Sequence, residues 1–367
     1  MTKNQLLRVI AFCLLVCMMF VFLCDLFEQE NNSNTSSRFL AYRTYPKDTV
    51  DAIYIGSSGV DRYWMAPKAY EEYGMTVYPL AADAMPPWIY TSVIEYALEY
   101  HDPKLVIVDV RSYSQSISAN AMDVRARRVL DAMAPFSRVW FGTAFKAMST
   151  IHKADPERSL FDVSLLLSFV RYHSKWEGAT LDFFKDNLGK YVHKYNGFFV
   201  NSRLSRKVEI QRFQQHSEER SPAEEIMVEA FYELLAYTEK KGLELLFVDT
   251  PQMQQPQEAS RSNYMYDLIA QEGCECLHWF TDRTDGSFSI PLDPEKHFYN
   301  AGHVNFEGAE IFTEYLAAYL HENYQLPDRR QDNRAKPYWD GVYDRLKEDI
   351  LEFPEIVTVA EEESDSE

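Results

Sequence analysis

Residues 105–110 read Leu-Val-Ile-Val-Asp-Val, and His101-Asp-Pro-Lys104 leads into them. A nearly continuous apolar run of this length is typical of a strand that is buried on both faces of a parallel sheet. Four further segments favour extended structure, namely residues 51–55, 76–81, 243–248 and 274–280. The sequence therefore predicts a sheet of about five strands.

Helical patterns alternate with these strands. Apolar residues recur at helical spacing in residues 223–241, 264–271 and 307–320. Alternation of strands and helices implies parallel strands that are joined by right-handed crossovers. We therefore expect an α/β fold over residues 46–325, built as a three-layer α/β/α sandwich around the sheet.

One long segment, residues 112–221, interrupts this alternation. It is rich in aromatic, Arg and Lys residues and has a largely helical pattern, for example over residues 160–170. We interpret it as an insertion or cap over the sheet rather than as an independent fold.

The N-terminus has the pattern of a membrane anchor. Residues 9–23 are all apolar or Cys, which approaches the roughly 20 residues needed to span the hydrocarbon layer. Lys3 and Arg8 precede this stretch and acidic residues follow it, so the positive-inside rule places the N-terminus in the cytoplasm. We expect residues 1–27 to be a single-pass anchor in the cell membrane, with the globular domain outside the cytoplasm. A cleaved signal peptide shares this pattern, but no small-x-small cleavage site directly follows Leu23.

Two polar segments flank the predicted domain. Residues 28–45 include the run Asn-Asn-Ser-Asn-Thr-Ser-Ser and are interpreted as a polar linker. Residues 326–367 form a C-terminal extension, in which residues 355–367 hold six acidic side chains and no basic one. Such a charge run is typical of a solvated, disordered tail.

Composition excludes several classes of protein. The chain has 367 residues, is 46% hydrophobic and carries a formal charge of −19 at pH 7, so it can bury a core and is not wholly disordered. An acidic protein repels phosphate backbones, so no nucleic-acid partner is expected. Five cysteines are too few for a disulfide framework, and Cys274-x-Cys276 alone is too little for zinc. We expect no metal and no cofactor.

The loops that follow the first strand and precede the final helix indicate a chemistry. Ligands of parallel α/β sheets bind at the carboxyl ends of the strands. Gly56-Ser57-Ser58-Gly59 follows the first strand, and His303 lies just before the last helix. A serine at such a turn acts as a nucleophile when a histidine in the same crevice removes its proton. Either residue alone is more often a turn or capping residue, so the prediction rests on the two together.

Both loops resemble a known family. Gly56-Ser57-Ser58 resembles the first block of the SGNH/GDSL hydrolases, in which the serine after Gly-x is the nucleophile. Asn300-x-x-His303 resembles their last block, Asp-x-x-His. The resemblance implies a flavodoxin-like SGNH fold over residues 54–320, with Ser58 as nucleophile and His303 as general base.

Two longer runs are similar to one branch of this family. They are Phe-Tyr-Asn-Ala-Gly-His-Val-Asn at 298–305, followed by Gly308-Ala309, and Tyr-His-Ser-Lys-Trp at 172–176. The branch comprises membrane-anchored bacterial relatives of the teichoic-acid D-alanylation protein DltD. This resemblance implies an extracytoplasmic protein whose partners are a cell-envelope glycopolymer and a multi-pass membrane-bound O-acyltransferase.

The sequence departs from the family pattern at three places. Asn300 stands where an aspartate usually orients the histidine; an asparagine does not stabilise an imidazolium and can favour the wrong tautomer. Asp293 is the alternative orienting residue. Residues 78–84 lack the glycine of the second block, and residues 108–111, Val-Asp-Val-Arg, stand in place of the third. The candidates for oxyanion or substrate binding are Gly56, Ser57, Ala82, Asp83, Asp109, Arg111 and Asn305.

Three functions are compatible with these residues. The first is transfer of an acyl group, of acetyl or D-alanyl type, through an ester on Ser58 to a cell-envelope polysaccharide or teichoic acid. The second is a hydrolase that uses the same Ser–His pair to remove esters from carbohydrates or lipids. The third is a catalytically inactive SGNH-like protein that binds a polymer or a partner.

Overall fold

The computed structural model of the protein describes residues 2–26, 34–171, 173–177, 192–201, 204, 207–208, 218–252, 254–282, 287–352 and 357–358. The chain divides into two compact units. One comprises Met1–Leu40 and Ser118–Val192, and the other comprises Ala41–Ile117 and His193–Glu367. The first unit thus contains most of the segment that the sequence marks as an insertion, and the location of that segment over the sheet remains a prediction.

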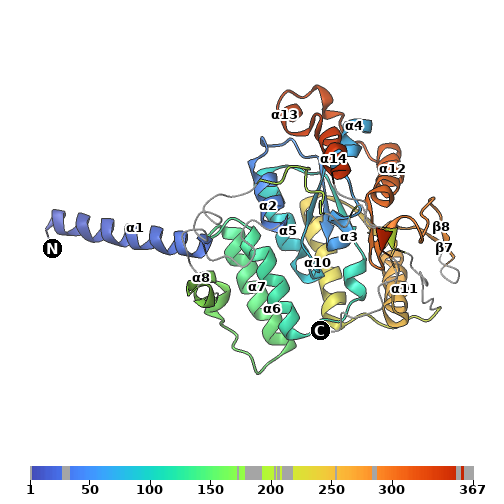
Figure 1. Ribbon diagram of the computed structural model, residues 1–367. Coiled ribbons are helices and arrows are strands. Elements are labelled where there is room, and N and C mark those ends of the chain that lie inside the picture. Colours follow the sequence, from blue (N-terminus) through green and yellow to red (C-terminus); the bar gives the residue numbers. More distant parts are fainter. Residues whose placement is uncertain are drawn as a thin grey trace. The chain divides into compact units, whose positions relative to one another are not determined.

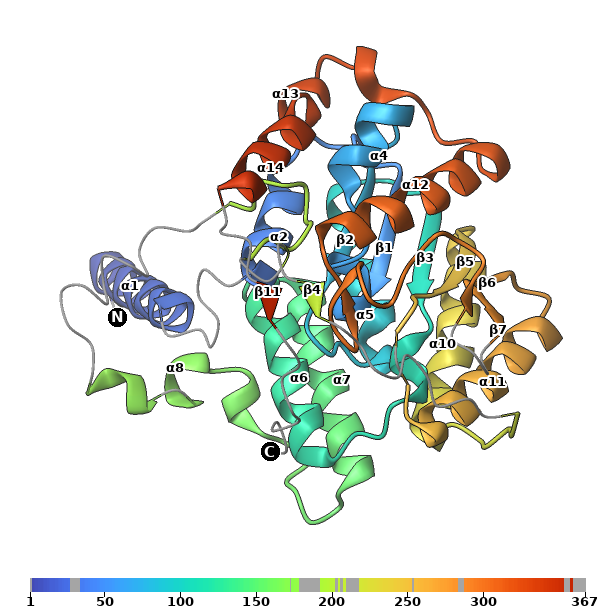
Figure 2. The same cartoon turned by 45° about the vertical axis from the view of Figure 1, so that its right-hand side comes forward.

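A five-stranded parallel sheet forms the centre of the second unit, as the sequence predicts (Figure 2). The order across the sheet is β2-β1-β3-β5-β6, and every neighbouring pair is parallel. Every residue of the first three strands is buried, which explains their nearly continuous apolar pattern. The strands are β1 (Ala52–Gly56), β2 (Val77–Ala81), β3 (Leu105–Asp109), β5 (Glu244–Asp249) and β6 (Cys276–His278).

Helices cover the sheet in two groups. Their bounds are α4 (Ala66–Tyr73), α5 (Tyr90–Tyr100), α10 (Glu225–Lys241), α11 (Pro256–Gln271) and α12 (Phe306–Asn323). The crossover from β1 to β2 runs toward one edge of the sheet, and those from β2 onward run toward the other. Because parallel crossovers are right-handed, α4 lies on one face and α5, α10 and α11 on the opposite face. The contacts of α4 with α12, and of α5 with α10, agree with this arrangement (Figure 2).

Helix α11 begins eight residues before its predicted start. Pro256 occupies its first turn, and Gln255 and Glu258 form a capping box in which each side chain bonds the other's backbone N–H. These capping residues start the helix before its apolar periodicity becomes visible at residue 264.

Short elements complete the second unit. They are α3 (Ser58–Asp61), η1 (Pro87–Ile89), η2 (Arg111–Ser114), β4 (Lys207–Val208), β7 (Phe280–Asp282), β8 (Ser287–Phe288), β9 (Phe298–Asn300), β10 (His303–Val304) and β11 (Val357–Thr358). Of these, α3 follows β1 directly, and β9 pairs with β10 just before α12.

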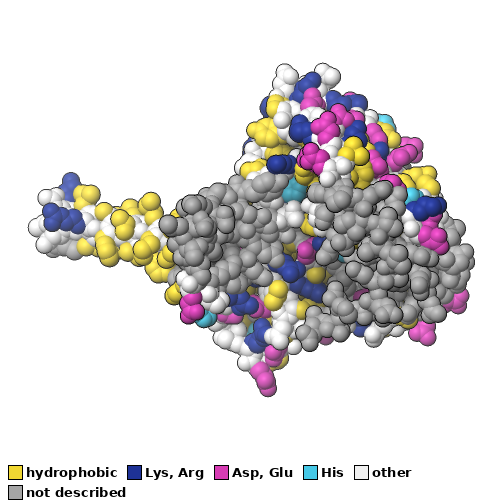
Figure 3. Space-filling model, viewed as in Figure 1, with side chains coloured by type: hydrophobic (Ala, Val, Ile, Leu, Met, Phe, Trp, Pro, Cys, Tyr) yellow, Lys and Arg dark blue, Asp and Glu magenta, His cyan; other side chains and the backbone are white. Residues whose placement is uncertain are grey.

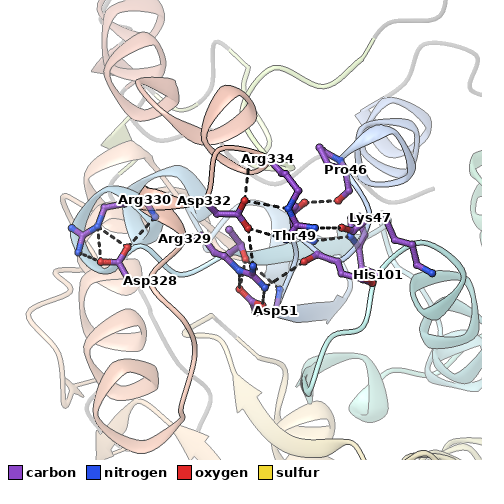
Figure 4. A network of polar contacts seen from close by, with 12 residues as sticks. Pro46, Lys47, Thr49, Asp51, His101, Asp328, Arg329, Arg330, Asp332 and Arg334 are labelled. Carbon is purple, nitrogen blue, oxygen red and sulfur yellow. Dashed lines mark hydrogen bonds and ion pairs between the residues drawn. The ribbon is translucent and has the colours of Figure 1, made fainter.

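The C-terminal extension belongs to the second unit as far as the structure describes it. It forms η6 (Arg329–Gln331), α13 (Lys336–Trp339) and α14 (Val342–Leu351). Arg329 joins it to the start of β1, with Nη2 2.6 Å from Asp51 Oδ1 and Nε 2.9 Å from Asp51 Oδ2 (Figure 4). Trp339 is 1% exposed, so the extension also contributes to the core. Apart from Val357–Thr358, the predicted acidic tail lies outside the described residues.

The first unit contains the predicted anchor. Helix α1 (Lys3–Leu26) is long and apolar enough over Lys3–Leu23 to cross a membrane (Figure 1). None of the side chains in that span is buried, and hydrophobic side chains cover much of its visible surface in Figure 3. Its orientation in a membrane and its retention after export remain predictions. The unit also contains α6 (Ala119–Ala132), α7 (Arg138–Ala154), η3 (Val163–Leu165), α8 (Ser168–Arg171) and η4 (His173–Trp176), and α1 contacts α8.

Two segments differ from the sequence prediction. The predicted linker at 28–45 is helical from its seventh residue, as α2 (Asn34–Thr44), and the residues before Asn34 lie outside the described part. Tyr42 is fully buried in α2 and its hydroxyl donates to Ala97 O, a tertiary contact that the polar composition does not reveal. The helical pattern at 160–170 corresponds to two short helices, η3 and α8, and Asp162 caps the first of them by accepting from the Ser164 N–H.

Candidate active site

Ser58 is the first residue of α3, directly after the turn that follows β1, where the strand order of the sheet reverses. Crevices at such points are the usual ligand sites of open α/β sheets. The two adjacent serines have opposite roles. Ser57 is 2% exposed and caps α3, accepting from the Gly59 N–H at 3.4 Å, whereas Ser58 is half-buried and accessible.

Asp109, at the end of β3, holds this turn in place. One of its carboxylate oxygens accepts from the Ser57 hydroxyl at 2.8 Å and from the Ser57 N–H at 3.3 Å. Its other oxygen accepts from the Arg111 N–H at 3.1 Å. Gly56 has a φ of +155°, and a Cβ on it would lie 2.3 Å from Asp109 Cβ. Gly56 is therefore required for the close approach of β1 to this carboxylate.

The Asp109 carboxyl is completely buried. Burial raises its pKa to about 6, although Arg111 and the hydroxyl of Ser57 both lower it. A carboxylate whose oxygens bond backbone and side-chain donors in this way is a structural support for the turn. The sequence places Asp109 among the candidates for oxyanion or substrate binding, and these contacts favour a structural role instead.

A tight hairpin presents the histidine. Strands β9 and β10 are antiparallel, and Asn300 and His303 lie directly opposite each other in the register. Only Ala301 and Gly302 separate them. The Asn-x-x-His spacing is therefore that of a two-residue hairpin loop, which brings the two opposed side chains together.

Three predicted residues form one hydrogen-bonded chain. Ser58 Oγ lies 2.8 Å from His303 Nε2, and His303 Nδ1 lies 2.9 Å from Asn300 Oδ1. The ring of Tyr299 stacks on the imidazole with an interplanar angle of 13°. All three members of the chain are half-buried, so a substrate can reach them. This is the nucleophile–base–orienter geometry of serine acyl-transfer sites.

The surroundings of Asn300 determine the histidine tautomer. Asn300 Oδ1 accepts from the Gly302 N–H at 3.0 Å, and a backbone N–H requires an oxygen at that position. The same oxygen faces His303 Nδ1, so Nδ1 carries the proton. Nε2 is then unprotonated and faces Ser58, as a general base must be. An asparagine at this position can favour the wrong tautomer, and the hydrogen bond from the Gly302 N–H prevents that here.

Arg111 fixes the hairpin rather than facing the nucleophile. Its Nη1 donates to Gly302 O at 2.9 Å, and the Tyr63 hydroxyl reaches the same carbonyl at 3.1 Å. A Cβ on Gly302 would lie 2.8 Å from Arg111 Nη2, so the absence of a side chain admits the guanidinium. Arg111 therefore connects the end of β3 to the loop that carries His303.

Arg62 is a site residue that the sequence pattern did not reveal. Its Nη1 lies 2.9 Å from His303 Nε2, and its Nη2 lies 3.0 Å from Asp83 Oδ1. Burial by itself lowers the pKa of Arg62, but the neighbouring Asp61, Tyr299 and Asp83 raise it above its usual value, so the guanidinium is charged. Arg62 follows Ser58 by four residues, at the C-cap of α3, and this spacing of one helical turn was the available signal.

The remaining candidates have other partners. The Ala82 N–H donates to Gly56 O at 3.3 Å, and Asp83 pairs with Arg62. Asn305 is a helix cap, accepting from the Gly308 N–H at 3.0 Å and donating to Lys296 O at 2.7 Å. The Ser58 N–H is the remaining backbone donor beside the nucleophile, and it meets no acceptor among the described residues.

Asp293 does not orient the histidine. Its carboxylate pairs with Lys296 at 2.6 Å, and its backbone N–H donates to His297 Nδ1 at 2.8 Å. Within the described part of the chain, no group of three or more His, Cys, Asp or Glu side chains is arranged to hold a metal ion.

Comparison with known proteins adds no assignment. No family model matches the sequence, and no curated protein matches it.

Proposed function

We propose that this protein is a membrane-anchored, extracytoplasmic serine acyl-transfer enzyme of SGNH type. The observation that supports this most directly is the 2.8 Å separation of Ser58 Oγ from His303 Nε2, together with the 2.9 Å separation of Nδ1 from Asn300 Oδ1. These side chains come from loops 245 residues apart in the sequence. The helix α1 supports the anchor, and the order of the five parallel strands, with Ser58 at the switch point, supports a flavodoxin-like SGNH fold.

The first half-reaction loads the acyl group. Ser58 Oγ attacks the carbonyl carbon of the acyl donor while His303 Nε2 accepts the hydroxyl proton. The developing oxyanion takes a hydrogen bond from the Ser58 N–H. The tetrahedral intermediate then expels the donor's oxygen or sulfur, which receives the proton from Nε2, and an ester remains on Ser58.

The second half-reaction transfers the acyl group from Ser58 to the acceptor. A hydroxyl of the acceptor loses its proton to Nε2 and attacks the ester carbonyl, after which Ser58 Oγ leaves with that proton. The acceptor proposed is a cell-envelope polysaccharide or teichoic acid, and the acyl group is of acetyl or D-alanyl type. Such donors are made inside the cell, so the acyl group needs a membrane carrier, and a multi-pass membrane-bound O-acyltransferase is the proposed partner.

Trapping the nucleophile tests this proposal. A fluorophosphonate should label the full-length protein in detergent or vesicles, and mass spectrometry should place the label on Ser58. The Ser58→Ala variant should lose the label. The matched variant Ser57→Ala removes the adjacent buried hydroxyl and should keep it, although with a less stable turn.

The outcomes separate the possible functions. Labelling without turnover of small esters, combined with loss of polymer acylation in cells that carry Ser58→Ala, supports transfer. Rapid turnover of a small acetyl ester would instead assign a hydrolase. A folded protein that takes no label at Ser58 would refute both enzymatic functions and leave the binding protein.

A further inference from the structure

Two hydrogen-bond donors approach the same atom of the base. Ser58 Oγ is 2.8 Å and Arg62 Nη1 is 2.9 Å from His303 Nε2. With its proton on Nδ1, the imidazole has one lone pair at Nε2. An arginine can only donate, so Arg62 competes with Ser58 for the lone pair that has to accept the serine proton.

The Arg62 guanidinium is held by two neighbouring side chains and lies next to solvent. Arg62 pairs with Asp83, and its Cζ lies 4.5 Å from the centre of the Phe199 ring. The side chain of Asp83 is 48% exposed and that of Arg62 14%, so the ion pair borders solvent. Arg62 Nε is buried and meets no acceptor among the described residues, whereas the Tyr299 side chain also hydrogen-bonds to Arg62.

A fixed cation here also opposes catalysis electrostatically. When His303 accepts the serine proton it becomes positively charged, and a guanidinium at hydrogen-bond distance repels that charge. Two carboxylates offset this effect in part: Asp83, which contacts Nη2 of Arg62 and is half exposed, and the buried Asp61, which also raises the pKa of Arg62. In this geometry His303 therefore has the correct tautomer, but Arg62 hinders its action as a base.

We propose that Arg62 is a positioning residue that couples the reactivity of Ser58 to an anionic group on the substrate. A phosphate or carboxylate oxygen near Ser58 forms stronger, charge-assisted hydrogen bonds with the guanidinium than the neutral imidazole nitrogen does. It withdraws Arg62 from His303 Nε2, which leaves the lone pair to Ser58, and its charge compensates the imidazolium. This inference rests on the proposed function and specifies its substrate class as anionic.

Three fluorophosphonate probes of equal length can measure this coupling on the full-length protein. Their tails end in a neutral hydroxyl, a carboxylate or a phosphate monoester, so the last two distinguish the anion that is recognised. We expect the wild type to be labelled about tenfold faster by an anionic probe than by the neutral one, the effect of one charge-assisted hydrogen bond. A ratio near one in a labelled wild type would overturn the inference and leave the proposed function intact.

Variants separate this coupling from a structural role. Arg62→Gln should react about tenfold faster than the wild type with the neutral probe, and its anionic preference should disappear. Arg62→Lys keeps the charge without the planar fork and should retain part of the preference. Asp83→Asn removes the internal carboxylate partner and should increase it.

A matched control and the contrary results complete the experiment. Arg330→Gln removes an exposed arginine that also pairs with an aspartate, Asp328, and should leave all three rates unchanged. Slower labelling of Arg62→Gln by every probe, or a preference retained in that variant, would refute the inference. Failure of every variant and of the wild type to take any probe would refute the proposed function instead.

Discussion

Replacing Asn300 by aspartate tests the hydrogen-bonded chain most sharply. The two side chains have the same shape, and the Asn300 oxygen already accepts from the Gly302 N–H and from His303 Nδ1–H at 3.0 and 2.9 Å. In Asn300→Asp a carboxylate oxygen takes over both bonds. The substitution therefore changes the charge that faces the imidazole and leaves the hydrogen-bond pattern intact.

The size of the effect follows from the tautomer. A hydrogen bond to a charged group stabilises by about 1 to 2 kcal/mol more than a neutral one, and the imidazolium forms only during proton transfer. We therefore expect Ser58 to react roughly 5- to 30-fold faster in Asn300→Asp. If asparagine instead held His303 in the wrong tautomer, restoring aspartate would accelerate the reaction by about 10⁴, as the reverse change in a serine protease triad indicates.

The assay is the second-order rate of fluorophosphonate labelling at Ser58, measured near neutral pH in both proteins. Asn323→Asp serves as the control, because it adds the same charge at an exposed helix end. An increase close to 10⁴ would contradict the assignment of the Asn300 oxygen toward His303. A decrease would show that the carboxylate disrupts the hairpin.

Three further predictions concern buried contacts at the two ends of the central strands. The pKa of Asp109 in the folded protein, about 6, exceeds its ordinary value of 3.8, so the stability it contributes is fully present below about pH 4 and lost as the pH rises through 6. Between pH 4 and 7, the difference in unfolding free energy between wild type and Asp109→Asn, measured with urea, should therefore change by up to about 3 kcal/mol. A difference that does not change with pH would contradict the raised pKa of the buried Asp109 carboxyl. Gly56→Ala should cost at least about 3 kcal/mol of unfolding free energy because its Cβ would lie 2.3 Å from Asp109 Cβ, and an unchanged melting temperature would disprove that contact. Arg329→Gln breaks a largely buried bidentate pair with Asp51 and should lower the unfolding free energy by about 2 kcal/mol, whereas no loss would mean that the C-terminal extension is not held by this pair (Figure 4).

Features of this protein that depend on local sequence patterns could be predicted from its sequence. Every residue of β3 is buried and all but its last, Asp109, are apolar, so the run is visible without knowledge of the fold. The Ser58 and His303 loops could be paired because parallel strands place all their carboxyl ends on one edge of a sheet. Both inferences depend on local patterns and on one general rule of topology.

Features that depend on contacts between distant segments could not be predicted in this way. Helix α2 was interpreted as a linker because burial of Tyr42 against residues near position 100 is a tertiary contact. The N-terminal start of α11 was missed because capping residues precede the apolar periodicity.

The same distinction applies to the active site. The residue types Ser58, His303 and Asn300, and the membrane-spanning length of the N-terminal helix, follow from the linear order of amino acids. The tautomer of His303 depends on a backbone N–H that points at Asn300, and the competition for Nε2 depends on Arg62 facing across from another loop. Hydrogen bonds are directional and fall off within a few tenths of an ångström, so such relations exist only once the chain has folded.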